Sequence, residues 1–192
     1  MHYLFLFLVC SLYFIFHSLL ADLRVKSFFK KHFPFLFSYY RIIYNLISIL
    51  GLIILGYFTL QVTDYFILPT LFLKIIGIVF LILSLILFYI AFNAFDMWEF
   101  LGISSKHDTQ YSNLIVGGIY QYVRHPLYTA TIIICIALLC LHPTFGVLTF
   151  CLATFVYLET GTRLEEKKLI AEFGNEYIEY QKRVKKYFPY LY

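Results

Sequence analysis

A short stretch of the chain gathers side chains that are suited to holding a charged ligand. It contains Tyr120, Arg124, His125, Pro126 and Tyr128. Proline suits the first turn of a helix because its missing N–H costs nothing there, so we expect a helix to begin at this corner. The N-terminal end of a helix attracts a carboxylate or a phosphate. A lone His-Pro pair is typical of a simple helix cap, whereas the flanking arginine and tyrosines favour a binding site.

A second polar cluster follows farther along the chain. Glu165 and Glu166 are adjacent acids, and the turn-rich segment 173–177 comes soon after them. Gly174 is expected to end a helix, since glycine tolerates the left-handed conformation, and Asn175 is expected to cap the next helix. Alone, the acidic pair is typical of a solvated helix start. Close to the first cluster, it would instead form part of a polar site.

The elements between the two clusters are expected to bring them together. Two apolar runs, Leu127–Leu141 and Thr144–Leu158, are separated by His142 and Pro143. An antiparallel helix-turn-helix hairpin returns the second cluster to the membrane face of the first. At the helical rise, each run covers about 23 Å of a hydrocarbon core of roughly 30 Å, so a re-entrant hairpin remains an alternative to two full crossings.

Composition predicts an integral membrane protein. Hydrophobic residues make up 61% and charged residues 14% of the 192 residues, and mean hydropathy is +0.80, whereas soluble domains carry about 45–50% apolar and about 25% charged residues. Three further runs of spanning length are Tyr3–Leu20, Ile42–Leu60 and Leu71–Phe92. The first lacks a basic leading region, so we expect a retained span rather than a signal peptide. The predicted fold is an all-α bundle of five transmembrane helices, forming one domain over residues 1–192.

Basic residues orient this bundle. All but Lys74 fall on one side: Arg24, Lys26, Lys30, Lys31, Arg41, Lys106, Arg124, Arg163, Lys167, Lys168, Lys182, Arg183, Lys185 and Lys186. The positive-inside rule then predicts that the N-terminus lies outside and that the C-terminus lies in the cytoplasm. Residues from Arg163 on are expected to form cytoplasmic amphipathic helices. The net charge of +4 indicates contact with anionic membrane lipids rather than with nucleic acid.

The cysteines, the glycine pair and two further acids give weaker indications of a functional site. The cysteines lie inside apolar runs without zinc-ligand spacing, so no metal site or disulfide is expected; they are Cys10, Cys135, Cys140 and Cys151. The Gly117-Gly118 pair has neither the lysine nor the hydroxyl of a phosphate-binding loop. Asp96 and Glu99 either line a polar site or are solvated acids, and both interpretations stay open.

Together these motifs resemble a known group of enzymes. Tyr120-x-x-x-Arg124-His125-Pro126-x-Tyr128, followed by Glu165-Glu166 and Phe173-Gly174-x-x-Tyr177-x-x-Tyr180, is similar to the isoprenylcysteine carboxyl methyltransferase and phospholipid methyltransferase superfamily. This resemblance covers about the last 80 residues. The first half is similar to the NnrU and methanethiol S-methyltransferase branch, through His17-Ser18-Leu19-Leu20-Ala21, Tyr40-Arg41-x-x-Tyr44-Asn45 and Asp96-x-x-x-Phe100-Leu101-Gly102.

The resemblance implies S-adenosylmethionine as methyl donor, held by the half of the chain from about residue 93 to residue 192. Carried over by position, the cofactor contacts are Ser112, Asn113, Leu114, Ile115, Tyr120, His125, Pro126, Leu127, Tyr128, Glu165 and Glu166. Glu165 is expected to bind the ammonium group of the cofactor, and the helix start at Pro126 its carboxylate. No catalytic group is assigned, because methyl transfer to an ionised acceptor needs alignment more than acid–base help.

The expected acceptor is a small thiol or a lipid-like molecule. Isoprenylcysteine enzymes carry a substrate-contacting arginine four residues before the first glutamate, where this chain has Gly161. Arg163 is near that position without being equivalent to it. A thiol acceptor must react as the thiolate, and whether Arg124 or His125 assists its ionisation stays open.

Two other functions compete with the methyltransferase. A non-enzymatic accessory or transport-related protein of the NnrU type would keep the scaffold without its chemistry. An NADPH-dependent membrane reductase would share the Arg-His-Pro-x-Tyr motif, but this chain looks too short for that family and lacks its additional spans. Binding of S-adenosylhomocysteine or of NADPH separates the three possibilities.

Overall fold

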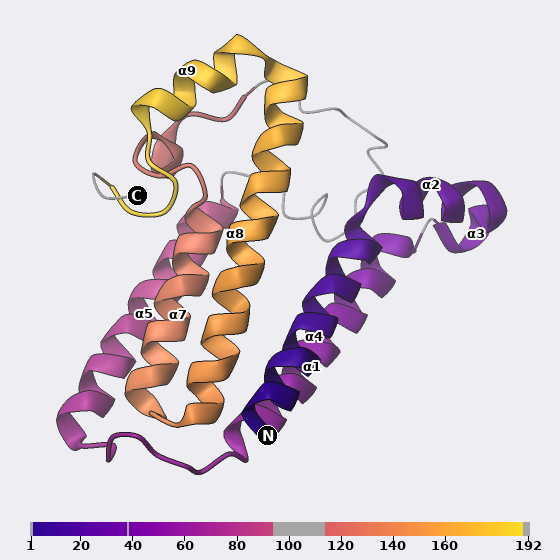
Figure 1. Ribbon diagram of the computed structural model, residues 1–192. Coiled ribbons are helices and arrows are strands. Elements are labelled where there is room, and N and C mark those ends of the chain that lie inside the picture. The colour runs from indigo at the N-terminus through magenta and orange to yellow at the C-terminus, as the bar shows by residue number, and fades with distance from the viewer. Residues whose placement is uncertain (1, 38, 94–113, 190–192) are drawn as a thin grey trace. The chain divides into compact units, whose positions relative to one another are not determined.

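The computed structural model describes residues 2–37, 39–93 and 114–189, and within these ranges the regular structure is helical, with no strand (Figure 1). The elements, in chain order, are α1 (His2–Ala21), α2 (Leu23–His32), α3 (Pro34–Phe37), α4 (Tyr40–Leu60), α5 (Leu71–Phe92), the 3-10 helix η1 (Gly118–Gln121), α7 (Pro126–Leu141), α8 (Phe145–Phe173) and α9 (Asn175–Arg183).

Four of these helices are long and apolar enough to cross a membrane. They are α1, α4, α5 and α8, with 20, 21, 22 and 29 residues. Many of their apolar side chains are exposed, as expected for helices that lipid rather than water surrounds. The remaining apolar helix, α7, has 16 residues. The chain is therefore an all-α, multi-pass integral membrane protein, as its composition predicts.

The structure corrects the end of the last apolar run. We expected a span ending at Leu158 and a separate amphipathic helix from Arg163, but α8 runs unbroken from Phe145 to Phe173. Glu159 pairs with Arg163 one turn later, at 3.5 Å between Oε2 and Nη2, across the expected break. The segment contains no proline, and its many strong helix formers outweigh the single Gly161. The acidic pair thus lies on the same helix as the apolar run.

The turn after α8 is confirmed in position and corrected in detail. Gly174 adopts φ +58°, so it ends the helix as predicted, in a conformation that side-chain-bearing residues rarely adopt. Asn175 does not cap α9, because it is the first helical residue and Gly174 itself holds the cap position. A single residue turns the chain, which leaves no room for a separate cap.

The chain folds into two compact units, which are described separately. In the first, formed by the described residues among 1–67 and 142–157, α1 and α4 pack together with the start of α8. Its core contains Cys10, Phe14, Leu55 and Ala153. A Cβ on Gly51 would lie 2.6 Å from the ring of Tyr13, so the close approach of α1 and α4 depends on this glycine.

A polar clamp also joins α1 to α4. His17 Nδ1 lies 2.9 Å from Ser48 Oγ, and Tyr44 Oη lies 2.9 Å from His17 Nε2. Ser48 Oγ donates its own proton to the carbonyl of Tyr44, at 2.8 Å. Nδ1–H of His17 therefore donates to Ser48, and Tyr44 donates to Nε2. Both ring nitrogens are satisfied in this arrangement of a neutral imidazole.

The second unit contains the described residues among 68–93, 114–141 and 158–189. Its two apolar helices, α5 and α7, lie side by side (Figure 1). A buried hydrogen bond joins them, from Ser84 Oγ to the carbonyl of Ala130 at 2.8 Å. A Cβ on Gly77 would lie 2.7 Å from Leu141, so glycine permits the close contact. This packing fixes the axis of α7, whose first turn carries the candidate site.

Candidate functional site

The His-Pro corner opens α7 as the sequence predicts. Pro126 is the first residue of the helix and is buried. The residue before it, His125, is 6% exposed, and its carbonyl accepts a hydrogen bond from the backbone N–H of Thr129 at 3.0 Å. The imidazole is therefore held in place at the N-terminal end of an apolar helix.

The acidic pair of α8 meets this corner, also as predicted. His125 Nε2 lies 3.0 Å from Oε1 of Glu166, and Nδ1 lies 3.7 Å from Oε2 of Glu165. Arg124 approaches the same Oε1 of Glu166, with Nε at 2.9 Å and Nη2 at 2.8 Å. The histidine thus stands between two carboxylates, one of which also pairs with the neighbouring guanidinium.

The two glutamates differ in what they can do. The side chain of Glu166 is 13% exposed and that of Glu165 is 48% exposed. Glu166 accepts charge-assisted hydrogen bonds within the protein, so a ligand would have to displace the guanidinium of Arg124 to reach its Oε1. Glu165 offers its carboxylate to the surface. It is the better placed of the pair to receive a cationic group from a ligand.

Arg124 has a structural role that the sequence left open. Its Nη1 donates to the carbonyl of Gln181 at 3.2 Å and also to the carbonyl of Val184. These carbonyls lie at the C-terminal end of α9, where cations complement the helix dipole. Arg124 therefore ties the corner to α9 and to Glu166 at once.

The tail after α9 completes the corner. The backbone N–H of Arg124 donates to the carbonyl of Lys185 at 2.8 Å, and that of His125 donates to the carbonyl of Lys186 at 3.1 Å. The hydroxyl of Thr129 donates to the carbonyl of Tyr187 at 2.7 Å. The sequence does not predict this pairing, because a bridge of one residue pair has no hydrophobic pattern of its own.

Two side-chain contacts, one buried and one partly buried, hold the tail against α8. Tyr187 is 1% exposed, and its hydroxyl lies 3.0 Å from Oγ1 of Thr162. Lys186 Nζ lies 3.1 and 3.2 Å from the two carboxylate oxygens of Glu159. The ring of Tyr187 also stands edge-on to His125, with 6.3 Å between the ring centroids. The histidine is therefore enclosed from this side as well.

Two tyrosines of α9 form a buried cluster on the side of the helix that faces the rest of the unit. Tyr177 and Tyr180 are buried and pack with Leu114, and the hydroxyl of Tyr180 donates to the carbonyl of Tyr120 at 2.5 Å. Burial raises the pKa of Tyr180 to about 12. Burial, reinforced by the negative charge of Glu166, also raises the pKa of Tyr177. Tyr120 thus joins the site through its backbone, with a protonated phenol as its partner.

The other residues that the sequence analysis singles out lie in different surroundings. Tyr128 stacks on His125, with 5.5 Å between centroids and 8° between planes. Ile115 and Leu127 are half-buried. Outside the described residues lie Ser112, Asn113, Asp96 and Glu99. Arg163, whose role was also open, is 72% exposed and pairs with Glu159.

A cavity of about 340 Å³ lies in the same unit. It is lined by Gln121, Tyr122, Arg183, Lys185 and Pro189. None of the predicted cofactor contacts lines it. One of its lining residues is joined to the corner by a backbone hydrogen bond, in which the carbonyl of Lys185 accepts the N–H of Arg124.

Comparison with known proteins identifies the family. The chain belongs to the NnrU protein family, whose model matches residues 5–188. It is 39% identical over 72 residues to methanethiol S-methyltransferase 1 of Bradyrhizobium diazoefficiens, covering 38% of this chain and 25% of that protein. It is 40% identical over 73 residues to methanethiol S-methyltransferase of Pseudomonas deceptionensis, covering 38% and 27%.

A second group of relatives carries a different name. The chain is 35% identical over 91 residues to protein-S-isoprenylcysteine O-methyltransferase of Homo sapiens, covering 46% of this chain and 31% of that protein. The matches thus span between a quarter and a third of these relatives. No solved structure matches. Both groups carry the name of methyltransferases, which agrees with the resemblance noted in the motifs.

Proposed function

We propose that this protein is an integral membrane methyltransferase that uses S-adenosylmethionine and methylates a small thiol. One observation carries the proposal: His125 is fixed between Glu166, which is paired internally, and Glu165, which is half exposed at 48%. The names of the relatives support the class of reaction. The arrangement offers one accessible carboxylate beside a rigid helix start.

The residues at this corner fit such a cofactor. When bound, S-adenosylmethionine supplies a methyl group on a positively charged sulfonium sulfur. Glu165 would hold the ammonium group, and the N-terminal end of α7 would receive the carboxylate. Aromatic faces attract cations, and the Tyr128 ring, stacked on His125, provides one. The other proposed contacts are Ser112, Asn113, Leu114, Ile115, Tyr120, Pro126, Leu127 and Glu166.

Positioning is the main contribution of the protein to the proposed reaction. The acceptor sulfur forms a bond to the methyl carbon as the bond from that carbon to the sulfonium breaks, so the three atoms must be in line. Holding reactants in this geometry accounts for a large part of such barriers. Arg124 is committed to Glu166 and to the end of α9, so it acts by holding the corner. The thiol must arrive as, or become, the thiolate.

Gly161 favours a small thiol over a prenylated cysteine. A Cβ at this position would meet only the hydroxyl of Tyr128, at 3.8 Å. The chain therefore lacks the cation that isoprenylcysteine enzymes place here for their substrate. A lipid-like acceptor is the second class to test, because an apolar surrounding suits both.

We also propose a topology of five crossings in a single domain, with α7 as the fourth crossing. α7 packs along α5, a membrane-length helix, which supports a transmembrane position for it. Its 16 residues span about 24 Å, so α7 needs a locally thinner bilayer or a few more residues at its ends. The basic residues then put the site and the C-terminus on the cytoplasmic face of a bacterial inner membrane, with the N-terminus outside.

Calorimetry on the detergent-purified chain tests the cofactor. We expect S-adenosylhomocysteine to bind at micromolar concentration and NADPH not to bind. Binding of NADPH alone would replace the proposal by a reductase, and binding of neither would favour a non-enzymatic accessory protein.

A methylation assay with labelled donor tests the acceptor. Methanethiol, a prenylcysteine and phosphatidylethanolamine are offered in parallel. We expect label in the methanethiol product. Label in the lipid or the prenylcysteine instead would keep the methyltransferase and overturn the thiol acceptor.

A further inference from the structure

Helix α2 has two chemically distinct faces. With 3.6 residues per turn, Val25, Phe28, Phe29 and His32 fall on one face of the helix. Lysines and Arg24 occupy the rest of the surface, in two groups. Lys26 and Lys30 flank the side of Phe29, whereas Arg24 and Lys31 flank the side of Phe28. A basic amphipathic helix of this kind lies in the plane of a membrane surface.

The position of α2 in the chain agrees with an interfacial helix. α2 and α3 lie in the chain between α1 and α4, and α1 and α4 are both membrane-length helices. The α2–α3 segment lies at the end of the α1–α4 pair away from the N-terminus (Figure 1). Asp22 caps α2 by accepting the N–H of Arg24 at 2.8 Å. The hydroxyl of Tyr40 donates to the carbonyl of Leu20 at 2.7 Å, which fixes the start of α4 against the end of α1.

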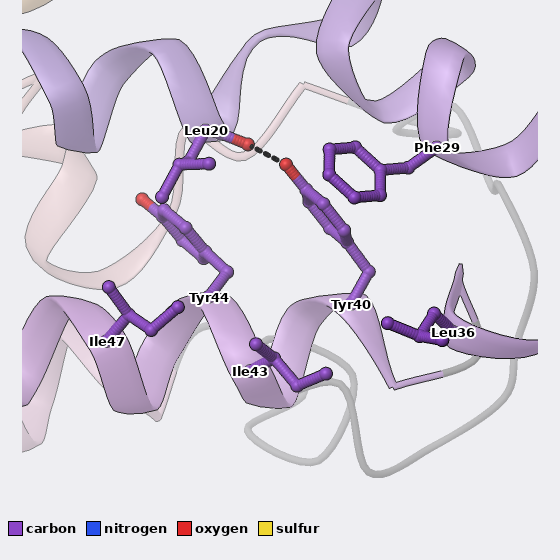
Figure 2. Close-up of a pocket in the computed structure, with 7 residues that line it drawn as sticks. All are labelled: Leu20, Phe29, Leu36, Tyr40, Ile43, Tyr44 and Ile47. Carbon is purple, nitrogen blue, oxygen red and sulfur yellow. Dashed lines mark hydrogen bonds between the residues drawn. The ribbon is translucent and has the colours of Figure 1, made fainter. Parts of the chain in front are cut away.

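A small apolar cavity lies where α1 ends and α4 begins (Figure 2). Its volume is about 100 Å³, and it is lined by Leu20, Phe29, Leu36, Tyr40, Ile43, Tyr44 and Ile47. An engineered apolar cavity of about 150 Å³ binds benzene, so this one accommodates a few methylene groups. Because α1 ends and α4 begins here, the cavity would lie at the depth of the upper part of a lipid acyl chain.

A series of aromatic rings connects the cavity to a cation. Phe29 and Tyr40, which both line the cavity, have ring centroids 5.1 Å apart. Phe37 stacks on Tyr40 at 6.0 Å, and Lys30 Nζ lies 5.8 Å from the Phe37 centroid. A positive charge and an apolar cavity are therefore separated by about one ring.

We propose that α2 and the cavity beside it bind one anionic phospholipid, independently of the proposed methyltransferase site. Lys26 and Lys30 hold the phosphate-bearing head group, and the upper methylene groups of one acyl chain occupy the cavity beside Phe29. The two requirements, negative charge and hydrocarbon, meet in the same molecule. A lipid with a neutral head group satisfies only the second, so it binds more weakly.

Native mass spectrometry of the full chain tests this with phosphatidylglycerol and phosphatidylcholine of identical acyl chains. We expect one phosphatidylglycerol to bind per protein, more tightly than phosphatidylcholine. The double substitution Lys26→Gln/Lys30→Gln should weaken binding about tenfold or more, from the contribution of each basic residue near an anionic lipid. The control Arg24→Gln/Lys31→Gln removes the same charge from the opposite flank and should change binding by less than about twofold.

A third variant tests the cavity. Ile43→Phe adds bulk to its wall without changing charge, and should weaken phosphatidylglycerol binding several-fold. Equal binding of the two lipids, or an equal loss in both double variants, would reduce the site to a non-specific basic surface and overturn the proposal. Unchanged binding in Ile43→Phe would overturn the role of the cavity. Helical circular dichroism verifies that each variant is folded.

Discussion

Nε2 of His125 lies 3.0 Å from Oε1 of Glu166, although the two residues are 41 positions apart in the chain. The contact joins the start of α7 to the charged part of α8 and defines the orientation of the imidazole. Arg124 contacts the same carboxylate oxygen, so the side chains of Arg124 and His125 meet at the largely buried carboxylate of Glu166. The neighbouring Glu165 is left at the surface, and this asymmetry between adjacent acids leads to the first two predictions.

Glu165→Gln should weaken the binding of S-adenosylhomocysteine by about tenfold or more, since a hydrogen bond to a charged group contributes about 1.5–3 kcal/mol. Calorimetry measures the change. Glu172→Gln removes an exposed acid from the same helix and should leave affinity and folding unchanged. Wild-type affinity in Glu165→Gln would remove this residue from the site.

Glu166→Gln should instead destabilise the protein. Removing one partner of a largely buried ion pair leaves the other charge uncompensated, at a cost of about 3–5 kcal/mol; the side chains of Arg124 and Glu166 are 11% and 13% exposed. The melting temperature in detergent should fall by several degrees. The double variant with Arg124→Gln should lose less than the sum of the two single variants, because the partners are coupled. Strict additivity would contradict a shared charge pair.

Tyr180 should make stability sensitive to alkaline pH. Its pKa rises from the ordinary value of 10.0 to about 12 because of burial, so the folded state prefers the neutral phenol. This contribution is complete below pH 10 and disappears as pH rises through 12. The melting temperature is measured between pH 10 and pH 12. It should fall less in Tyr180→Phe, which lacks the titrating group, than in the control Tyr122→Phe, which removes an exposed tyrosine.

Ser48→Ala should loosen the clamp between α1 and α4. The substitution removes the acceptor of His17 Nδ1, and hydrogen bonds between membrane helices contribute about 0.6–2 kcal/mol. We expect a lower melting temperature, measured by differential scanning fluorimetry. Ser18→Ala, at an exposed position of α1, is the matched control. An equal effect of both substitutions would indicate that the clamp adds no stability.

Reporter fusions test the proposed crossing of α7. Each site is fused in turn to a reporter that is active only outside the cytoplasm and to one that is active only inside it. If α7 crosses the membrane, the fusion after Pro143 should be active with the first reporter, and the fusion within the α2–α3 segment with the second. Cytoplasmic location of both sites would establish the re-entrant alternative.

The sequence predicted those features that depend on local chemistry or on long periodic patterns. The membrane class, the start of α7 at Pro126 and the end of α8 at Gly174 are of this kind. The meeting of His125 with the acidic pair was also predicted, because the two apolar runs between them are of similar length and return the chain to the same level.

Features that depend on rotation about a helix axis or on short pairings were not predicted. Adjacent residues of a helix point about 100° apart, and the sequence does not reveal which of Glu165 and Glu166 faces inward. The separate helix from Arg163 was wrong, because continuation of α8 depends on a balance of helix propensities near Gly161. The pairing of Lys185 with Arg124 involves too few residues to leave a pattern.

The hydrogen bonds from Arg124 and His125 to the tail impose an order on biogenesis. The apolar helices enter the lipid as they are synthesised, whereas residues 185–187 leave the ribosome after all of these helices. Until then, the backbone of the histidine corner lacks its partners. These backbone contacts of the histidine corner therefore form only after α9 and the tail have been synthesised.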